Sequence, residues 1–115
     1  MAGLDGHRTA ELRSLAYHCR VAEKLRDDRS LIARACSKLD AVIRDAAPGS
    51  PAAHYALGWR RLLDGSPAAL FEFLTSDSQE ARDFRQASPF AGALSARERW
   101  QLWRDTATQP TGIDP

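Results

Sequence analysis

The residues best suited to chemistry are arginines and aromatic side chains that gather between residues 84 and 104. Arginine binds carboxylates and phosphates through two parallel hydrogen bonds, and tryptophan and arginine are the residue types most enriched at interface hot spots. We therefore expect non-covalent recognition of a partner, in which the aromatic rings are anchors if exposed and the arginines pair with carboxylates. The candidate partner-binding residues are Arg85, Phe90, Arg97, Arg99, Trp100 and Trp103.

The same residue types permit other interpretations. Together with Arg60 and Arg61, which follow Trp59, these arginines could form a positive, aromatic-bearing face that suits an acidic protein or RNA. Alternatively, Trp59, Trp100 and Trp103 are core residues and the arginines only solvate the surface. The sequence leaves open whether Trp100 and Trp103 are buried or exposed.

A second pattern is the R-x4-H spacing of Arg13 and His18. It resembles the motif of the HEPN family of helical ribonucleases, and the resemblance implies that arginine and histidine act together at the scissile phosphate of RNA. In a helix of about 3.6 residues per turn, two such residues lie about 140° apart and do not share a face. We favour a solvated arginine and a histidine at the core boundary, and keep a HEPN-like ribonuclease, usually dimeric, as the alternative.

Other constellations that carry chemistry are missing from the sequence. The histidines and cysteines, at positions 7, 18, 54, 19 and 36, match no zinc-ligand spacing such as C-x2-C or H-x3-H. There is no G-x-S-x-G elbow and no glycine-rich phosphate loop. We therefore expect a protein that is not an enzyme and uses no metal and no cofactor, with Cys19 and Cys36 buried as small apolar side chains.

Length and charge limit the classes of protein. The 115 residues suffice for one domain, and the formal net charge of +1 provides no overall attraction for nucleic acid or membrane. No segment approaches the roughly 20 apolar residues that span a bilayer, and the N-terminus lacks the apolar run of a signal peptide. We expect a cytoplasmic protein that does not contact membranes.

Helical periodicity in the first half predicts two long helices. The first begins near His7 and carries apolar residues at helical spacing as far as Leu25, and the second runs from Ser30 to Ala46. We expect these two helices to form an antiparallel hairpin. Residues 1–6 are expected to be a flexible N-terminus.

Capping signals predict shorter helices in the second half. Ser50-Pro51 and Ser66-Pro67 each provide a cap followed by proline at the first helical position, and a fifth helix starts around Asp77 and ends near Ala87. Ser88-Pro89 ends that helix, and Ser95 with Glu98 forms a capping box that begins the sixth. The expected fold is all-α, a compact bundle of about five to six helices over residues 7–105, with a disordered tail at 106–115.

The C-terminal third also carries a resemblance. The residues RQASPFAG from Arg85 to Gly92, followed by Leu94-Ser95 and by RERW from Arg97 to Trp100, resemble the C-terminal region of small bacterial antitoxin-like regulators. These regulators are often encoded beside a nucleotidyltransferase-type toxin. The first helix, in Arg13 to Leu25, is similar to the helix that opens the same region.

The resemblance implies a toxin-binding protein and identifies no catalytic residues. Such regulators often carry an N-terminal helix-turn-helix that binds DNA, whereas this chain begins with the helical region that would follow it, so no direct DNA binding is expected. We therefore predict a non-enzymatic antitoxin-like protein that binds and neutralises a toxin of nucleotidyltransferase type. A structural helical interaction module is a further alternative, and the oligomeric state, the partner's identity and any role in autoregulation stay open.

Overall fold

All regular structure in the described part of the chain is α-helical. The computed structural model describes residues 2–107, with side chains over residues 8–105. The predicted all-α fold of five to six helices is confirmed. The helices are α1 (Ala2–Asp27), α2 (Ser30–Asp45), α3 (Pro51–Asp64), α4 (Pro67–Thr75), α5 (Gln79–Gln86) and α6 (Ala96–Ala107).

Both ends of the helical region differ from the expectation. α1 begins at Ala2 rather than near His7, because extending an existing helix adds a hydrogen bond for each residue and can outweigh the roughly 1 kcal/mol that a glycine such as Gly3 or Gly6 costs. Of the tail expected at 106–115, Thr106 and Ala107 belong to α6, and residues 108–115 lie outside the described residues.

Serine side chains cap three of the short helices. The hydroxyls of Ser50 and Ser66 accept hydrogen bonds from backbone N–H groups in the first turns of α3 and α4, at 3.2 and 3.1 Å, as predicted. The cap of α5 is Ser78, whose hydroxyl accepts from the Ala81 N–H at 3.1 Å. The expected start around Asp77 is therefore one residue early, and the Asp77 carboxylate pairs instead with Arg82 at 3.1 Å.

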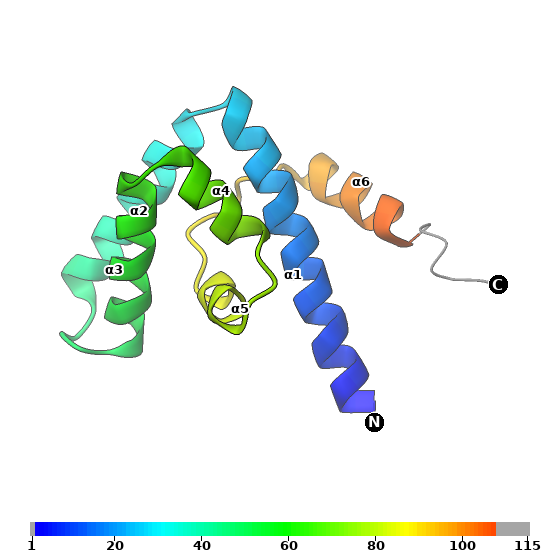
Figure 1. Cartoon of the computed structure of the whole chain (residues 1–115), viewed down its shortest axis with the longest axis horizontal. Coiled ribbons are helices and arrows are strands. Elements are labelled where there is room, and N and C mark those ends of the chain that lie inside the picture. Colours follow the sequence, from blue (N-terminus) through cyan, green and yellow to red (C-terminus); the bar gives the residue numbers. More distant parts are fainter. Residues whose placement is uncertain (1, 108–115) are drawn as a thin grey trace.

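The packing partners of the two long helices differ from the prediction. α2 packs most extensively against α3, whereas α1 packs against α4, α5 and α6. Figure 1 shows α1 on one side and the α2–α3 pair on the other, with α4 and α5 between them and α6 beyond α1. The predicted α1–α2 hairpin is wrong, because an apolar stripe shows which face of a helix is buried and not which neighbour covers it.

Trp59 is the largest fully buried side chain. Its ring meets those of Phe73, Phe84 and Phe90 edge-on, with centroids 5.6 to 6.0 Å apart, and its Nε1 donates to the Phe84 carbonyl at 2.9 Å. Gly58 makes room for this cluster, since a Cβ there would lie 2.4 Å from the Phe84 ring. The aromatic cluster therefore joins α3, α4, α5 and the segment that follows α5.

That segment, residues 88–95, is called the 88–95 loop below and lies against α1 and α2. Tyr17 donates to the Phe90 carbonyl at 2.8 Å, Lys24 to the Ala93 carbonyl at 2.9 Å, and Lys38 to the Ala91 carbonyl. Gly92 has a φ of +83°, a conformation that favours glycine, as its place after the turn predicted. Side chains from two helices therefore satisfy the main chain of this loop.

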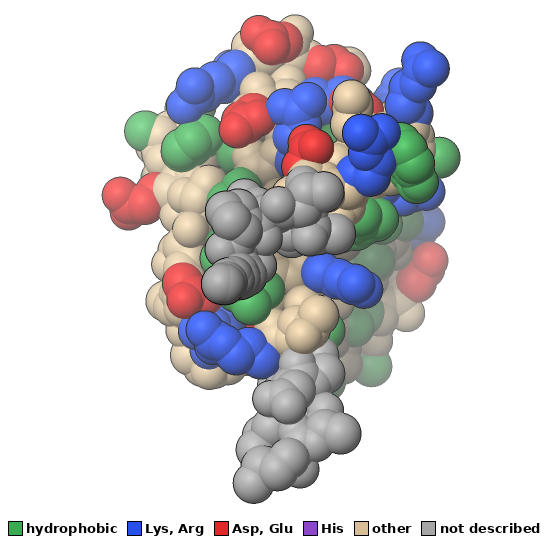
Figure 2. Space-filling view, turned by 90° about the vertical axis from the view of Figure 1, so that its right-hand side faces the viewer, with side chains coloured by type: hydrophobic (Ala, Val, Ile, Leu, Met, Phe, Trp, Pro, Cys, Tyr) green, Lys and Arg blue, Asp and Glu red, His purple; other side chains and the backbone are tan. Residues whose placement is uncertain are grey.

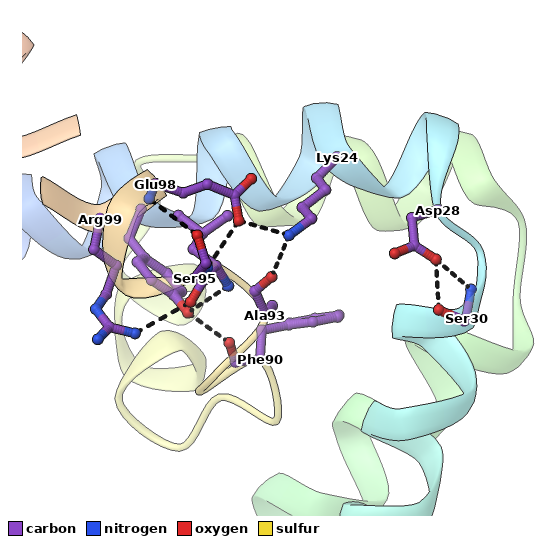
Figure 3. Close-up of polar contacts among 10 residues, drawn as sticks. Lys24, Asp28, Ser30, Phe90, Ala93, Ser95, Glu98 and Arg99 are labelled. Carbon is purple, nitrogen blue, oxygen red and sulfur yellow. Dashed lines mark hydrogen bonds and ion pairs between the residues drawn. The ribbon is translucent and has the colours of Figure 1, made fainter. Parts of the chain in front are cut away.

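The start of α6 is tied to α1 through the predicted capping box. The Ser95 hydroxyl accepts from the Glu98 N–H at 3.1 Å, and Glu98 Oε1 accepts from the Ser95 N–H at 2.8 Å. The same Oε1 accepts from Lys24 Nζ at 2.7 Å, as Figure 3 shows. The hydrogen bonds from Lys24 and Ser95 lower the pKa of Glu98 from 4.5 to about 2.

Replacing Glu98 by glutamine tests this connection. Glutamine keeps an acceptor for the Ser95 N–H but loses the charge that attracts Lys24, so we expect the free energy of unfolding to fall by about 1 kcal/mol at neutral pH. The contribution of ionised Glu98 is complete above its ordinary pKa of 4.5 and disappears as the pH falls toward about 2. Urea denaturation at several pH values should show the difference between wild type and variant shrinking over this range.

Glu80→Gln is the control, because Glu80 also lies in the first turn of a helix but is exposed. A loss in Glu98→Gln no larger than in this control, or one that persists unchanged in acid, would contradict the assigned role of the Lys24–Glu98 pair.

Candidate protein-binding surface

Helix α6 exposes one tryptophan together with two arginines. Trp100 is 59% exposed, and the Arg104 guanidinium lies 4.9 Å from the centre of its ring. Arg97 is also exposed and precedes Trp100 by three residues, so Arg97, Trp100 and Arg104 lie along one face of the helix. The half-buried Leu102 packs against the core and so directs this face outward.

Helix α1 contributes to the same surface through Arg13. Its guanidinium lies 5.9 Å from the centre of the half-buried Trp103 ring, and the neighbouring Leu12 is 49% exposed. We call this surface the α1–α6 face and define it by Arg13, Arg97, Trp100, Trp103 and Arg104. Aromatic rings flanked by guanidinium groups are typical of protein-binding hot spots.

Two of the predicted partner-binding residues lie inside the protein. Phe90 is 1% exposed and packs against Trp59, so it does not meet the condition of exposure under which we expected it to be an anchor. Arg85 is 5% exposed and donates from Nη1 to the Ser76 carbonyl at 2.6 Å. The expectation that they lie on an exposed partner-binding surface is wrong, because Phe90 belongs to the aromatic cluster around Trp59 and the Arg85 guanidinium turns inward to the Ser76 carbonyl.

The remaining arginine of the predicted set has an internal role as well. Arg99 is half-buried, and its Nη1 donates to the Leu94 carbonyl at 3.1 Å, where it supports the end of the 88–95 loop. The structure thus brings Arg97, Trp100 and Trp103 to the α1–α6 face and assigns Arg85, Phe90 and Arg99 to internal contacts.

Charges of both signs are present on the side of the molecule where α1 and α6 lie. In Figure 2, lysine and arginine side chains there are interspersed with acidic and hydrophobic ones and form no continuous basic field in the part that is not covered. A phosphate backbone is best matched by a basic stripe. The mixed surface is better suited to a protein with both apolar and charged groups.

The Arg13 and His18 pair is divided between two environments. His18 is 4% exposed, whereas Arg13 is exposed and lies against Trp103. Since a carbonyl can only accept, His18 Nδ1 donates to the Ser14 carbonyl at 2.7 Å, and Nε2 of the neutral ring accepts from the Ser88 hydroxyl at 2.8 Å. Both ring nitrogens are occupied, so this arrangement does not present an arginine and a histidine to one RNA phosphate.

The Ser88 hydroxyl is held on two sides. Besides donating to His18, it accepts a hydrogen bond from the Phe90 N–H at 3.1 Å. His18 and Ser88 therefore fix the beginning of the 88–95 loop to α1. Sequence patterns did not reveal this contact or those of Tyr17 and Lys24. A lysine between the apolar Val21 and Leu25 is nevertheless a sign that a charged side chain lies near the core and has a partner there.

Other potentially reactive groups are dispersed. Cys19 and Cys36 are free and half-buried rather than fully buried, and burial raises the pKa of the Cys19 thiol. Among the side chains of residues 8–105, no three histidine, cysteine or acidic groups gather as metal ligands. Within residues 2–107, no helix combines the length and the apolar character needed to cross a bilayer.

The burial of His18 predicts a pH dependence of stability. Burial lowers the pKa of His18 below its ordinary value of 6.5, so in mild acid the unfolded chain binds a proton that the folded chain does not. Stability should be complete above 6.5 and should fall as the pH decreases toward the lowered pKa of the folded state. Urea denaturation should show this loss in the wild type and a weaker dependence in His18→Gln.

The matched control is His54→Gln, because His54 is exposed on α3. It should keep the pH dependence of the wild type. An identical pH dependence in wild type and His18→Gln would show that His18 is not the group responsible.

Comparisons with protein-family models, with curated proteins and with solved structures found no match to this chain. The sequence resemblance and the geometry of the α1–α6 face are therefore the basis for a functional proposal.

Proposed function

We propose that this chain is a non-enzymatic, antitoxin-like protein that neutralises a partner toxin by binding it through the α1–α6 face. The observation that supports this best is the exposure of Trp100 between Arg97 and Arg104. Leaving a large apolar ring in water forgoes about 2 kcal/mol of burial, which a complex would recover. Flanking guanidinium groups add specificity through carboxylates on the partner.

In the proposed contact, tryptophan and arginine side chains have different roles. Trp100 and Trp103 enter apolar depressions of the partner, and Arg97 and Arg104 pair with acidic side chains on its surface or at its active site. Arg13 lies against the Trp103 ring and orients it toward the interface. Only a preformed helical surface is required, so binding involves little loss of conformational freedom.

The class of partner follows from the resemblance of the segment from Arg85 to Trp100 to antitoxin-like regulators. We propose a toxin of nucleotidyltransferase type encoded by the neighbouring gene, with the complex formed in the cytoplasm and without direct contact of this chain with DNA. A structural interaction module would use the same face but would not relieve toxicity. Growth on co-expression therefore distinguishes the two functions.

Trp100→Ala tests the proposal directly. Because Trp100 is exposed, we expect its truncation to change the free energy of unfolding by no more than about 0.5 kcal/mol. Loss of an anchor at the centre of the interface should weaken binding of the partner by about 30-fold, or about 2 kcal/mol. Calorimetric titration with the product of the neighbouring gene measures the affinity, and growth on co-expression measures neutralisation.

Leu57→Ala is a suitable control, since Leu57 is an apolar side chain on α3 that is 43% exposed and lies outside the α1–α6 face. It should bind and neutralise like the wild type. Absence of any complex with the wild type, or equal affinity in Trp100→Ala, would refute the proposal.

A further inference from the structure

A small cavity of about 220 Å³ lies between α1 and α5, and we call it the α1–α5 cavity. Its lining contains two guanidinium groups, a hydroxyl, an amide and one carboxylate. None of these residues belongs to the α1–α6 face, so the cavity is separate from the proposed partner contact. The lining residues are Ala10, Glu11 and Ser14 from α1, and Arg82, Arg85 and Gln86 from α5.

Arg85 is the unusual member of this lining. It is 5% exposed, yet no carboxylate in residues 8–105 forms an ion pair with it, and its one hydrogen-bond acceptor there is the Ser76 carbonyl. Asp77 and Glu11 act on it only at longer range, and burial lowers its pKa. A buried guanidinium with a single neutral acceptor retains unused N–H donors and a charge that lacks close compensation.

Arg82 stands at the same cavity and is held in place. Its Nε donates to Asp77 Oδ1 at 3.1 Å, its Nη2 lies 3.1 Å from the same oxygen, and its Nη1 lies 3.9 Å from the Glu11 carboxylate. The described lining holds two arginines and one glutamate, and Asp77 pairs with Arg82 beside it, so Arg82 is compensated and Arg85 is the arginine without a carboxylate in contact. The cavity therefore combines a paired arginine, a buried arginine, a carboxylate and neutral hydrogen-bonding groups.

We infer that the α1–α5 cavity binds a small oxyanion, namely inorganic phosphate or the phosphate end of a small phosphate monoester. Arg85 and Arg82 would neutralise its charge, and the Ser14 hydroxyl and Gln86 amide would donate hydrogen bonds. Phosphate oxygens offer several acceptors to two guanidinium groups, which a single carboxylate cannot match. A volume of about 220 Å³ is large enough for a phosphate group.

Binding is measured by calorimetry and by thermal unfolding in phosphate and in chloride at equal ionic strength. The wild type should bind inorganic phosphate at one saturable site and unfold at a higher temperature in phosphate, because a ligand of the folded state stabilises it. Glycerol phosphate forms the second arm. Binding of both ligands supports a site open to phosphate monoesters, and binding of inorganic phosphate alone supports an enclosed site for the free ion.

Substitutions locate the site. Arg85→Gln and Arg82→Gln should each weaken phosphate binding at least about tenfold, the loss of one charge-assisted contact. Arg44→Gln should bind like the wild type, because the Arg44 side chain is 71% exposed on α2 and is not part of the cavity lining. The partner affinity of Arg82→Gln should be unchanged, which separates this test from that of the α1–α6 face.

An effect of phosphate no greater than that of chloride on the wild type would overturn the inference. If Arg85→Gln fails to fold because the Ser76 carbonyl loses its donor, phosphate binding by Arg82→Gln and Ser14→Ala tests the site instead. Undiminished phosphate binding in both of these variants would equally overturn it.

Discussion

The structure depends on satisfying the main chain of the 88–95 loop. In a partly buried segment without regular structure, the buried carbonyl groups must find partners, and each unpaired buried polar group costs about 1 to 3 kcal/mol. Here the partners are side chains of other elements, chiefly Tyr17 and Lys24 of α1 and Lys38 of α2. Because these donors come from helices distant in the sequence, the loop joins α1, α2 and α6 into one unit.

The orientation of the proposed interface is a consequence of the same contacts. Lys24 binds both the Ala93 carbonyl and the Glu98 carboxylate, so it sets where α6 begins and how it leaves the loop. With Leu102 packed against the core, Trp100 then has to face solvent. The contacts of the 88–95 loop thus determine how α6 is oriented, and this orientation leaves Trp100 exposed.

Arginine serves two different purposes in this protein. Arg97 and Arg104 are exposed on the same helix face as Trp100, and a guanidinium there stays hydrated. Arg85 is buried and lines the α1–α5 cavity, where its charge is only distantly compensated. Residue type alone does not distinguish these cases, since burial determines whether the charge faces solvent or the interior.

The sequence by itself determined the helices and most of their starts. Caps at Ser50, Ser66 and Ser95 and the glycine at position 92 depend on interactions within a few residues, and local patterns record such interactions directly. Its errors at α1 and at Asp77 concern helix ends, where neighbouring starting points differ little in free energy.

Only the tertiary structure decided which helices are neighbours and which predicted site residues reach the surface. α1 packs against α4, α5 and α6 rather than α2, Phe90 and Arg85 turn inward, and His18 meets Ser88 across 70 residues of chain. Exposure of Trp100 could not be read from its spacing, because an aromatic residue on a helix follows the same period in a core and in an interface. Contacts between distant segments determine which helices are neighbours and which side chains are exposed, and such contacts leave no local pattern in the sequence.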